Sequence, residues 1–193
     1  MSSALEILAE FLDNPARAAR LASERRAWAL GLLCLAASGG SLFLAQAVTR
    51  HFLPVASGPG SFAFVCLWSV LGGFLLAASL HLLADSWGLA GSGTGLFVLI
   101  GLSELAWTLV LPVALVLKAL GLDSWFTAFL LLGLAGALSM RLKARSLRHV
   151  YGLTAPRAWS LLLLPYLGVC GVAAAVMAAA VVGAAVSVAQ LFS

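Results

Sequence analysis

Glu104, His81 and Asp85 are three ionisable side chains that the sequence places in or beside its long apolar runs. Glu104 is the ninth residue of the apolar run 96–120, and an ionised acid near the middle of a bilayer costs on the order of 3 kcal/mol or more. We therefore expect Glu104 to face the interior of a helix bundle, with a partner or a bound proton. His81 and Asp85 are one helical turn apart near the end of the preceding run. Because the two runs are antiparallel and joined by a glycine-rich segment, we expect the three side chains to converge.

Three interpretations of this cluster stay open. It could be a structural polar cluster that fixes helix register, a proton or ion pathway, or a metal site. A His and an Asp four residues apart plus one Glu give only three ligands, so we name no metal ligand and no cofactor. The serines lie in loops or on small-residue helix faces, with no base placed beside one. We therefore expect a protein that is not an enzyme.

The composition of the chain indicates that these residues are positioned by helices within a membrane. Of the 193 residues, 63% are hydrophobic and 9% are charged, whereas a soluble domain carries about 25% charged residues. So few charges cannot cover a water-soluble particle of this size, and lipid must be the solvent for most of the chain. The net charge of +4 comes from bases clustered beside apolar runs, which indicates membrane topology rather than nucleic-acid binding.

The fold class that we predict is an all-α integral membrane protein with about five transmembrane helices. The expected spans are 27–49, 62–84, 96–120, 124–140 and 158–191, the last crossing to about residue 182. Gly121 should end the third span and Asp123 should cap the fourth. A basic loop over 141–157 should follow the fourth span.

Short amphipathic helices should precede the spans, so the chain divides into 1–26 and a membrane domain over 27–193. Leu5, Leu8 and Leu12 share one helical face, and Asn14-Pro15 should cap and begin a second helix. Two interpretations stay open: helices lying in the membrane interface, or helices packed under the bundle.

The placement of the bases predicts the orientation. With the N-terminus inside, only Arg50 and Lys118 lie outside, so the chain is a multi-pass protein of the inner (plasma) membrane with its C-terminus outside. The residues on the inner side are Arg17, Arg20, Arg25, Arg26, Arg141, Lys143, Arg145, Arg148 and Arg157. Six of these should contact lipid headgroups: Arg17, Arg20, Arg141, Lys143, Arg145 and Arg148.

Small residues mark close helix contacts in membranes, because they let two backbones approach. Gly133 with Gly136, Gly168 with Gly171, and the alanine-rich stretch after Gly171 carry this pattern. Packing inside the bundle and contact with a second membrane subunit both stay open.

Four segments of the chain form a recognisable series: NPARAARL, HLLADSWGLAGSGTG, the Ser103 to Pro112 segment, and LRHVYGLTAPRAWSLLLLP. Together they resemble the Yip (Ypt-interacting protein) domain family in its bacterial form. The resemblance implies five transmembrane helices, a cytoplasmic N-terminus and an outward C-terminus. Eukaryotic relatives bind Rab-type GTPases and serve vesicle traffic.

The function that we expect is that of a non-enzymatic scaffold or accessory subunit of a membrane complex. Its partners would be the lipid bilayer and a membrane protein or further copies of the chain, with no nucleic acid. The alternative is a small ion, proton or solute transporter that uses Glu104, His81 and Asp85.

Overall fold

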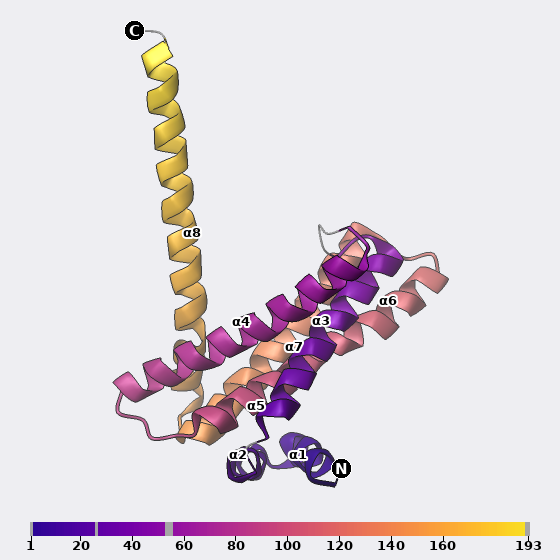
Figure 1. Ribbon diagram of the computed structural model, residues 1–193, viewed down its shortest axis with the longest axis vertical. Coiled ribbons are helices and arrows are strands. Elements are labelled where there is room, and N and C mark those ends of the chain that lie inside the picture. The colour runs from indigo at the N-terminus through magenta and orange to yellow at the C-terminus, as the bar shows by residue number, and fades with distance from the viewer. Residues whose placement is uncertain (1, 26, 53–55, 192–193) are drawn as a thin grey trace.

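Every regular element in the described part of the chain is a helix (Figure 1). The computed structural model describes residues 2–25, 27–52 and 56–191. The elements are α1 (Ser2–Asp13), α2 (Pro15–Glu24), α3 (Trp28–Thr49), α4 (Pro59–Ser86), α5 (Gly93–Glu104), the 3₁₀ helix η1 (Leu105–Leu109), α6 (Val110–Ala119), α7 (Trp125–Tyr151) and α8 (Ala155–Leu191).

Within the residues that the structure describes, five helices are long and apolar enough to cross a membrane: Trp28–Thr49, Pro59–Ser86, Gly93–Ala119, Trp125–Tyr151 and Ala155–Val182. The third of these joins α5, η1 and α6 into one span. The predicted all-α multi-pass fold is confirmed.

Helix α5 lies at the centre of the bundle. It contacts α2, α3, α4 and α7, and its buried side chains point in every direction around the helix: Leu96, Val98, Leu99, Ile100 and Leu102. A helix that is apolar all round is one surrounded by other helices. The sequence of α5 therefore fixes its central place.

Two glycines let α3 and α5 touch through their backbones. A Cβ atom added to Gly101 would stand 2.7 Å from the carbonyl oxygen of Gly31, which is closer than real contacts allow. Small residues at such a crossing bring two membrane helices together where lipid gives no hydrophobic drive.

The third span contains a short 3₁₀ segment just before Pro112. A proline inside a helix cannot donate an N–H, and its ring pushes away the carbonyl four residues earlier, which here belongs to Thr108. The 3₁₀ turn η1 includes Thr108, and the freed carbonyl accepts a hydrogen bond from Ser41 Oγ of α3 at 3.2 Å. The Thr108 carbonyl, which loses its helical hydrogen bond, thus has a hydrogen-bond donor inside the bundle.

The prediction of a basic loop over 141–157 is wrong. Helix α7 continues to Tyr151, and only 152–154 connect it to α8, which begins at Ala155. The segment holds no glycine or proline before Gly152, and Ala144 and Leu147 are buried. Gly152 ends the helix because its φ of 64° is left-handed.

The predicted end of the third span at Gly121 agrees with its left-handed φ of 70°. The predicted cap at Asp123 is wrong. Ser124 Oγ caps α7 instead, accepting the N–H of Thr127 at 3.2 Å.

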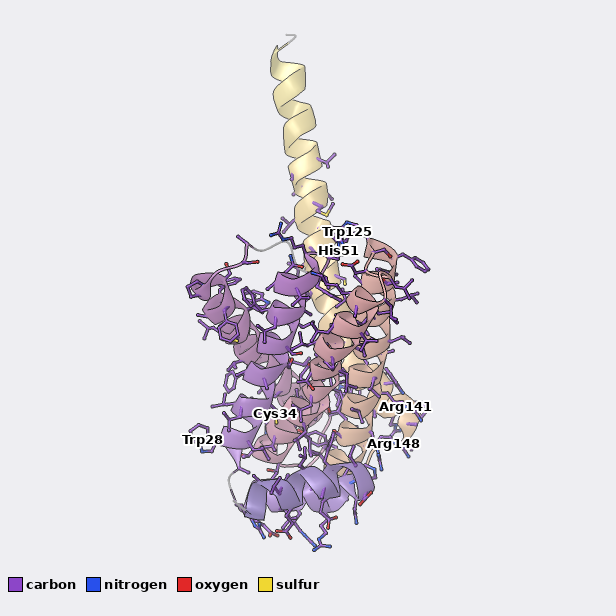
Figure 2. The ribbon with its side chains drawn as sticks, turned by 90° about the vertical axis from the view of Figure 1, so that its right-hand side faces the viewer. Trp28, Cys34, His51, Trp125, Arg141 and Arg148 are labelled. Carbon is purple, nitrogen blue, oxygen red and sulfur yellow. The ribbon has the colours of Figure 1, made fainter. Side chains whose placement is uncertain are left out.

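Helices α1 and α2 lie across one end of the bundle, here called the basal end (Figure 2). Asn14 caps α2 and Pro15 begins it, as predicted. Both helices contact α5, so they pack under the bundle. Their buried side chains include Ile7, Phe11, Ala18 and Ala22.

Helix α1 has apolar residues on two faces, and the face that we expected, with Leu5, Leu8 and Leu12, is the one that points away from the bundle. Ile7 and Phe11 face the bundle, whereas Leu5 and Leu12 are 64% and 62% exposed. An interfacial position, with these leucines in lipid, is compatible with packing under the bundle.

Helix α8 leaves the bundle. Its first turns pack on α4 and α7, with Leu161 and Leu162 fully buried. Beyond Tyr166 it extends away from the other helices (Figure 1), and every side chain from Leu167 to Val182 is exposed.

The crossing at Gly101 generates a prediction about stability. Gly101→Ala should lower the free energy of unfolding by about 1–3 kcal/mol, because the methyl group forces two backbones apart. The measurement is reversible unfolding in mixed detergent and SDS micelles. Gly72→Ala on α4 is the matched control, since a Cβ there meets no atom within 4 Å. A Gly101→Ala protein as stable as the control would contradict the proposed crossing.

Candidate functional site

Glu104 forms an ion pair with Lys143 inside the bundle. Glu104 ends α5 and Lys143 comes from α7, and their side chains are 14% and 6% exposed. Ser139, one turn before Lys143, donates to Glu104 Oε2 at 3.4 Å. Lys143 Nζ also lies 3.4 Å from the hydroxyl of Tyr166 on α8. We call these four residues the Glu104 cluster.

The Glu104 cluster satisfies the expectation that Glu104 has a partner within the bundle. Removing two charges from water costs several kcal/mol for each ion, and a close pair with further hydrogen bonds offsets much of that cost. The cluster joins α5, α7 and α8, so it links the first turns of α8 to the centre of the bundle.

Lys143 was expected at the lipid headgroups, and that prediction is wrong. On α7, Ser139, Lys143 and Ser146 lie on one buried side, since residues three and four apart share a helix face. Arg141 and Arg148 lie on other faces and are exposed (Figure 2).

The remaining arginines of the expected headgroup set lie near the basal end. Arg145 donates to the carbonyl of Leu12 at 3.1 Å, and so ties α7 to the end of α1. Arg17 and Arg20 are exposed, with Glu10 at 3.0 Å and Glu24 at 3.8 Å as their respective partners. Arg26, which was expected on the inner side but not in this set, lies outside the described residues.

His81 does not share a site with Glu104. Its Nδ1 is 2.7 Å from the hydroxyl of Tyr151 on α7, and the two rings stack. Asp85 is exposed at the end of α4. Within the described residues no three His, Cys, Asp or Glu side chains are grouped to hold a metal ion.

The expected convergence of the three residues fails for a geometrical reason. Glu104 comes 11 residues after the start of α5, and His81 comes five before the end of α4. At ~1.5 Å per residue, Glu104 lies roughly 9 Å deeper in the bundle than His81. The antiparallel pairing was expected correctly, but the depths of the two residues differ.

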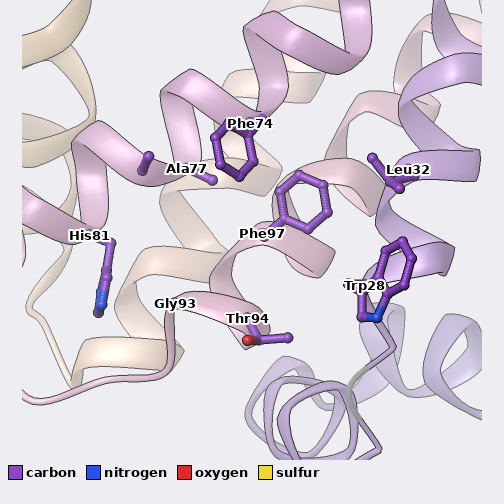
Figure 3. Close-up of a pocket in the computed structure, with 9 residues that line it drawn as sticks. Trp28, Leu32, Phe74, Ala77, His81, Gly93, Thr94 and Phe97 are labelled. Atoms are coloured by element: carbon purple, nitrogen blue, oxygen red, sulfur yellow. The ribbon is translucent and has the colours of Figure 1, made fainter.

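A cavity of about 470 Å³ lies between α3, α4 and α5 near the basal end (Figure 3). The residues that line it are Trp28, Leu32, Phe74, Ala77, Ala78, His81, Gly93, Thr94 and Phe97. Gly93 belongs to the glycine-rich segment between the second and third spans, where Ser92 caps α5 by accepting the N–H of Gly95. This cavity could not be predicted from the sequence, because its residues come from three separate helices.

The Glu104 cluster generates a second prediction. Lys143→Met should destabilise the protein by about 3–5 kcal/mol, because it leaves the Glu104 carboxylate buried without its partner. The double variant Glu104→Leu with Lys143→Met should recover most of that loss, since a well-packed apolar pair replaces the ions. Thermal and SDS unfolding measure both. Arg141→Met is the control, because that side chain is exposed on the same helix. A double variant no more stable than Lys143→Met would contradict this description of the cluster.

No family model, curated protein or solved structure matches the chain. The likeness to the Yip family therefore stays a prediction that rests on the four segments quoted above.

Proposed function

We propose that this chain is a non-enzymatic membrane protein, a scaffold or accessory subunit that binds another membrane protein through α8. The observation that carries the proposal is the exposed part of α8. Among the five candidate spans, the share of residues that is buried in the most apolar stretch is lowest in Ala155–Val182, at 11%. It is 17% in Pro59–Ser86 and Trp125–Tyr151, and 50% in Trp28–Thr49 and Gly93–Ala119.

The small residues of α8 support a partner outside the chain. A Cβ added to Gly168 or Gly171 would meet no atom within 4 Å, so packing inside the bundle does not explain these glycines. Glycine costs roughly 0.5–1 kcal/mol in a helix relative to alanine. In membranes, such small residues serve close approach between helices, and here the approaching helix would come from a second subunit.

The length of α8 agrees with this proposal. Its 37 residues would extend for roughly 55 Å, more than one bilayer crossing needs. The bundle covers only its first turns, anchored by Leu161, Leu162 and the contact of Tyr166 with Lys143. Helix α8 is thus packed on the bundle only through its first turns, and it is exposed from Leu167 to Val182.

The proposed orientation places the basal end in the cytoplasm of a cell with an inner (plasma) membrane. Arg17 and Arg20 of α2, Arg25 directly after α2, and the arginines near the end of α7 gather at this end, whereas Arg50 and Lys118 mark the opposite end. Bases are enriched on the cytoplasmic side of membrane proteins. A kinship with the Yip family would imply the same orientation.

The transporter alternative loses its main support. It needed Glu104, His81 and Asp85 in one pathway, but Glu104 is paired with Lys143 and His81 with Tyr151.

The test of the proposal is the size of the particle extracted from native membrane. In a mild detergent or polymer nanodisc, the wild-type chain should be part of a complex larger than its 19.9 kDa. Gly168→Leu with Gly171→Leu should release a folded monomer, because the added side chains block close approach. Mass photometry and mass spectrometry distinguish a second copy from a different partner.

Gly133→Leu provides the matched control for the α8 variant. Gly133 is an exposed glycine on α7 at which a Cβ also meets no atom within 4 Å, so this variant should keep the complex. A monomeric wild-type protein, or a complex that survives both α8 substitutions, would refute the proposal.

A further inference from the structure

We propose that the cavity between α3, α4 and α5 binds one phospholipid of the leaflet at the basal end. An acyl chain would occupy the apolar part, and His81 and Thr94 would hydrogen-bond to the polar part. This site is separate from α8 and does not depend on a protein partner.

The first support is the position of the cavity in the membrane. Its lining residues come from the basal ends of three candidate spans, so hydrocarbon rather than water surrounds it. Trp28 and Phe74 on its rim are 57% and 56% exposed, whereas Phe97 on its floor is 9% exposed. A lipid chain can therefore enter from the side and reach the floor.

The second support is the division between apolar and polar lining. Figure 3 shows the rings of Phe74 and Phe97 together, with Thr94 and the ring nitrogens of His81 nearer the start of α5. Ligand sites of ~300–1,000 Å³ combine apolar walls with a few placed polar groups. An apolar chamber with hydrogen-bonding groups at one end matches a lipid chain and its headgroup region.

The third support is the hydrogen bond of His81. When the Tyr151 hydroxyl donates to Nδ1, the neutral ring carries its proton on Nε2. A Cβ placed on Gly93 would lie 3.2 Å from Nε2, so this edge of the ring faces the start of α5. Nε2 and the Thr94 hydroxyl are then two donors for the ester or phosphate oxygens of one lipid.

The absence of a side chain at Gly93 keeps this end of the cavity open. A Cβ there would also stand 3.0 Å from Cδ2 of His81, tighter than most real contacts. A larger residue would occupy the space beside the imidazole where the polar part of the lipid would lie.

The test uses the full chain in nanodiscs of phosphatidylethanolamine and phosphatidylglycerol, followed by native mass spectrometry that removes bulk lipid. The wild type should retain one phospholipid. Ala78→Phe should lose it, because the ring fills the cavity, and Thr94→Val should retain it in a smaller fraction of molecules. Ala63→Phe is the control, an equal change at an exposed site on α4 outside the cavity.

The proposal is overturned if the wild type retains no lipid, if it retains only free fatty acid or detergent, or if Ala78→Phe retains as much as Ala63→Phe. A second measurement needs no variant. A phospholipid with a diazirine in its acyl chain should label Phe97 as well as the exposed Phe129 of α7, since only a chain inside the cavity can reach Phe97. Labelling of Phe129 without Phe97 would also overturn it.

Discussion

Hydrocarbon offers no hydrogen bonds, and this constraint governs the whole molecule. Each backbone polar group must find a partner inside the protein, so the described chain is helical and the carbonyl freed by Pro112 is met by Ser41. Each charge must lie at an end or be paired. Glu104, the acid deepest in a span, accordingly pairs with Lys143.

The same constraint divides the helices by role. Helix α5 is buried on all sides and holds the bundle together, while the Glu104 cluster ties its end to α7 and α8. From Leu167 to Val182, α8 is exposed and no other helix of the described residues covers it, although its glycines suit close contact. This arrangement, a buried and paired centre with α8 extending from it, supports our proposal that the protein acts by binding another membrane protein.

Much of this fold is predictable from sequence, because apolar length and the clustering of bases are one-dimensional signals. The five spans, the cap at Asn14 and the stop at Gly121 follow from such signals. The partner of Glu104 does not. Lys143 stands among bases that suggest a loop, and its burial depends on which face of α7 meets α5, a property of three-dimensional packing.

The most direct measurement is the labelling of single cysteines with a membrane-impermeant maleimide, in a background without Cys34, Cys66 and Cys170. Arg148→Cys lies at the basal end, and Ser57→Cys lies in the loop between α3 and α4 at the opposite end. The account predicts that intact cells label Ser57→Cys only, and that Arg148→Cys reacts once the membrane is permeabilised. Labelling of both positions from the same side would contradict the five-span arrangement.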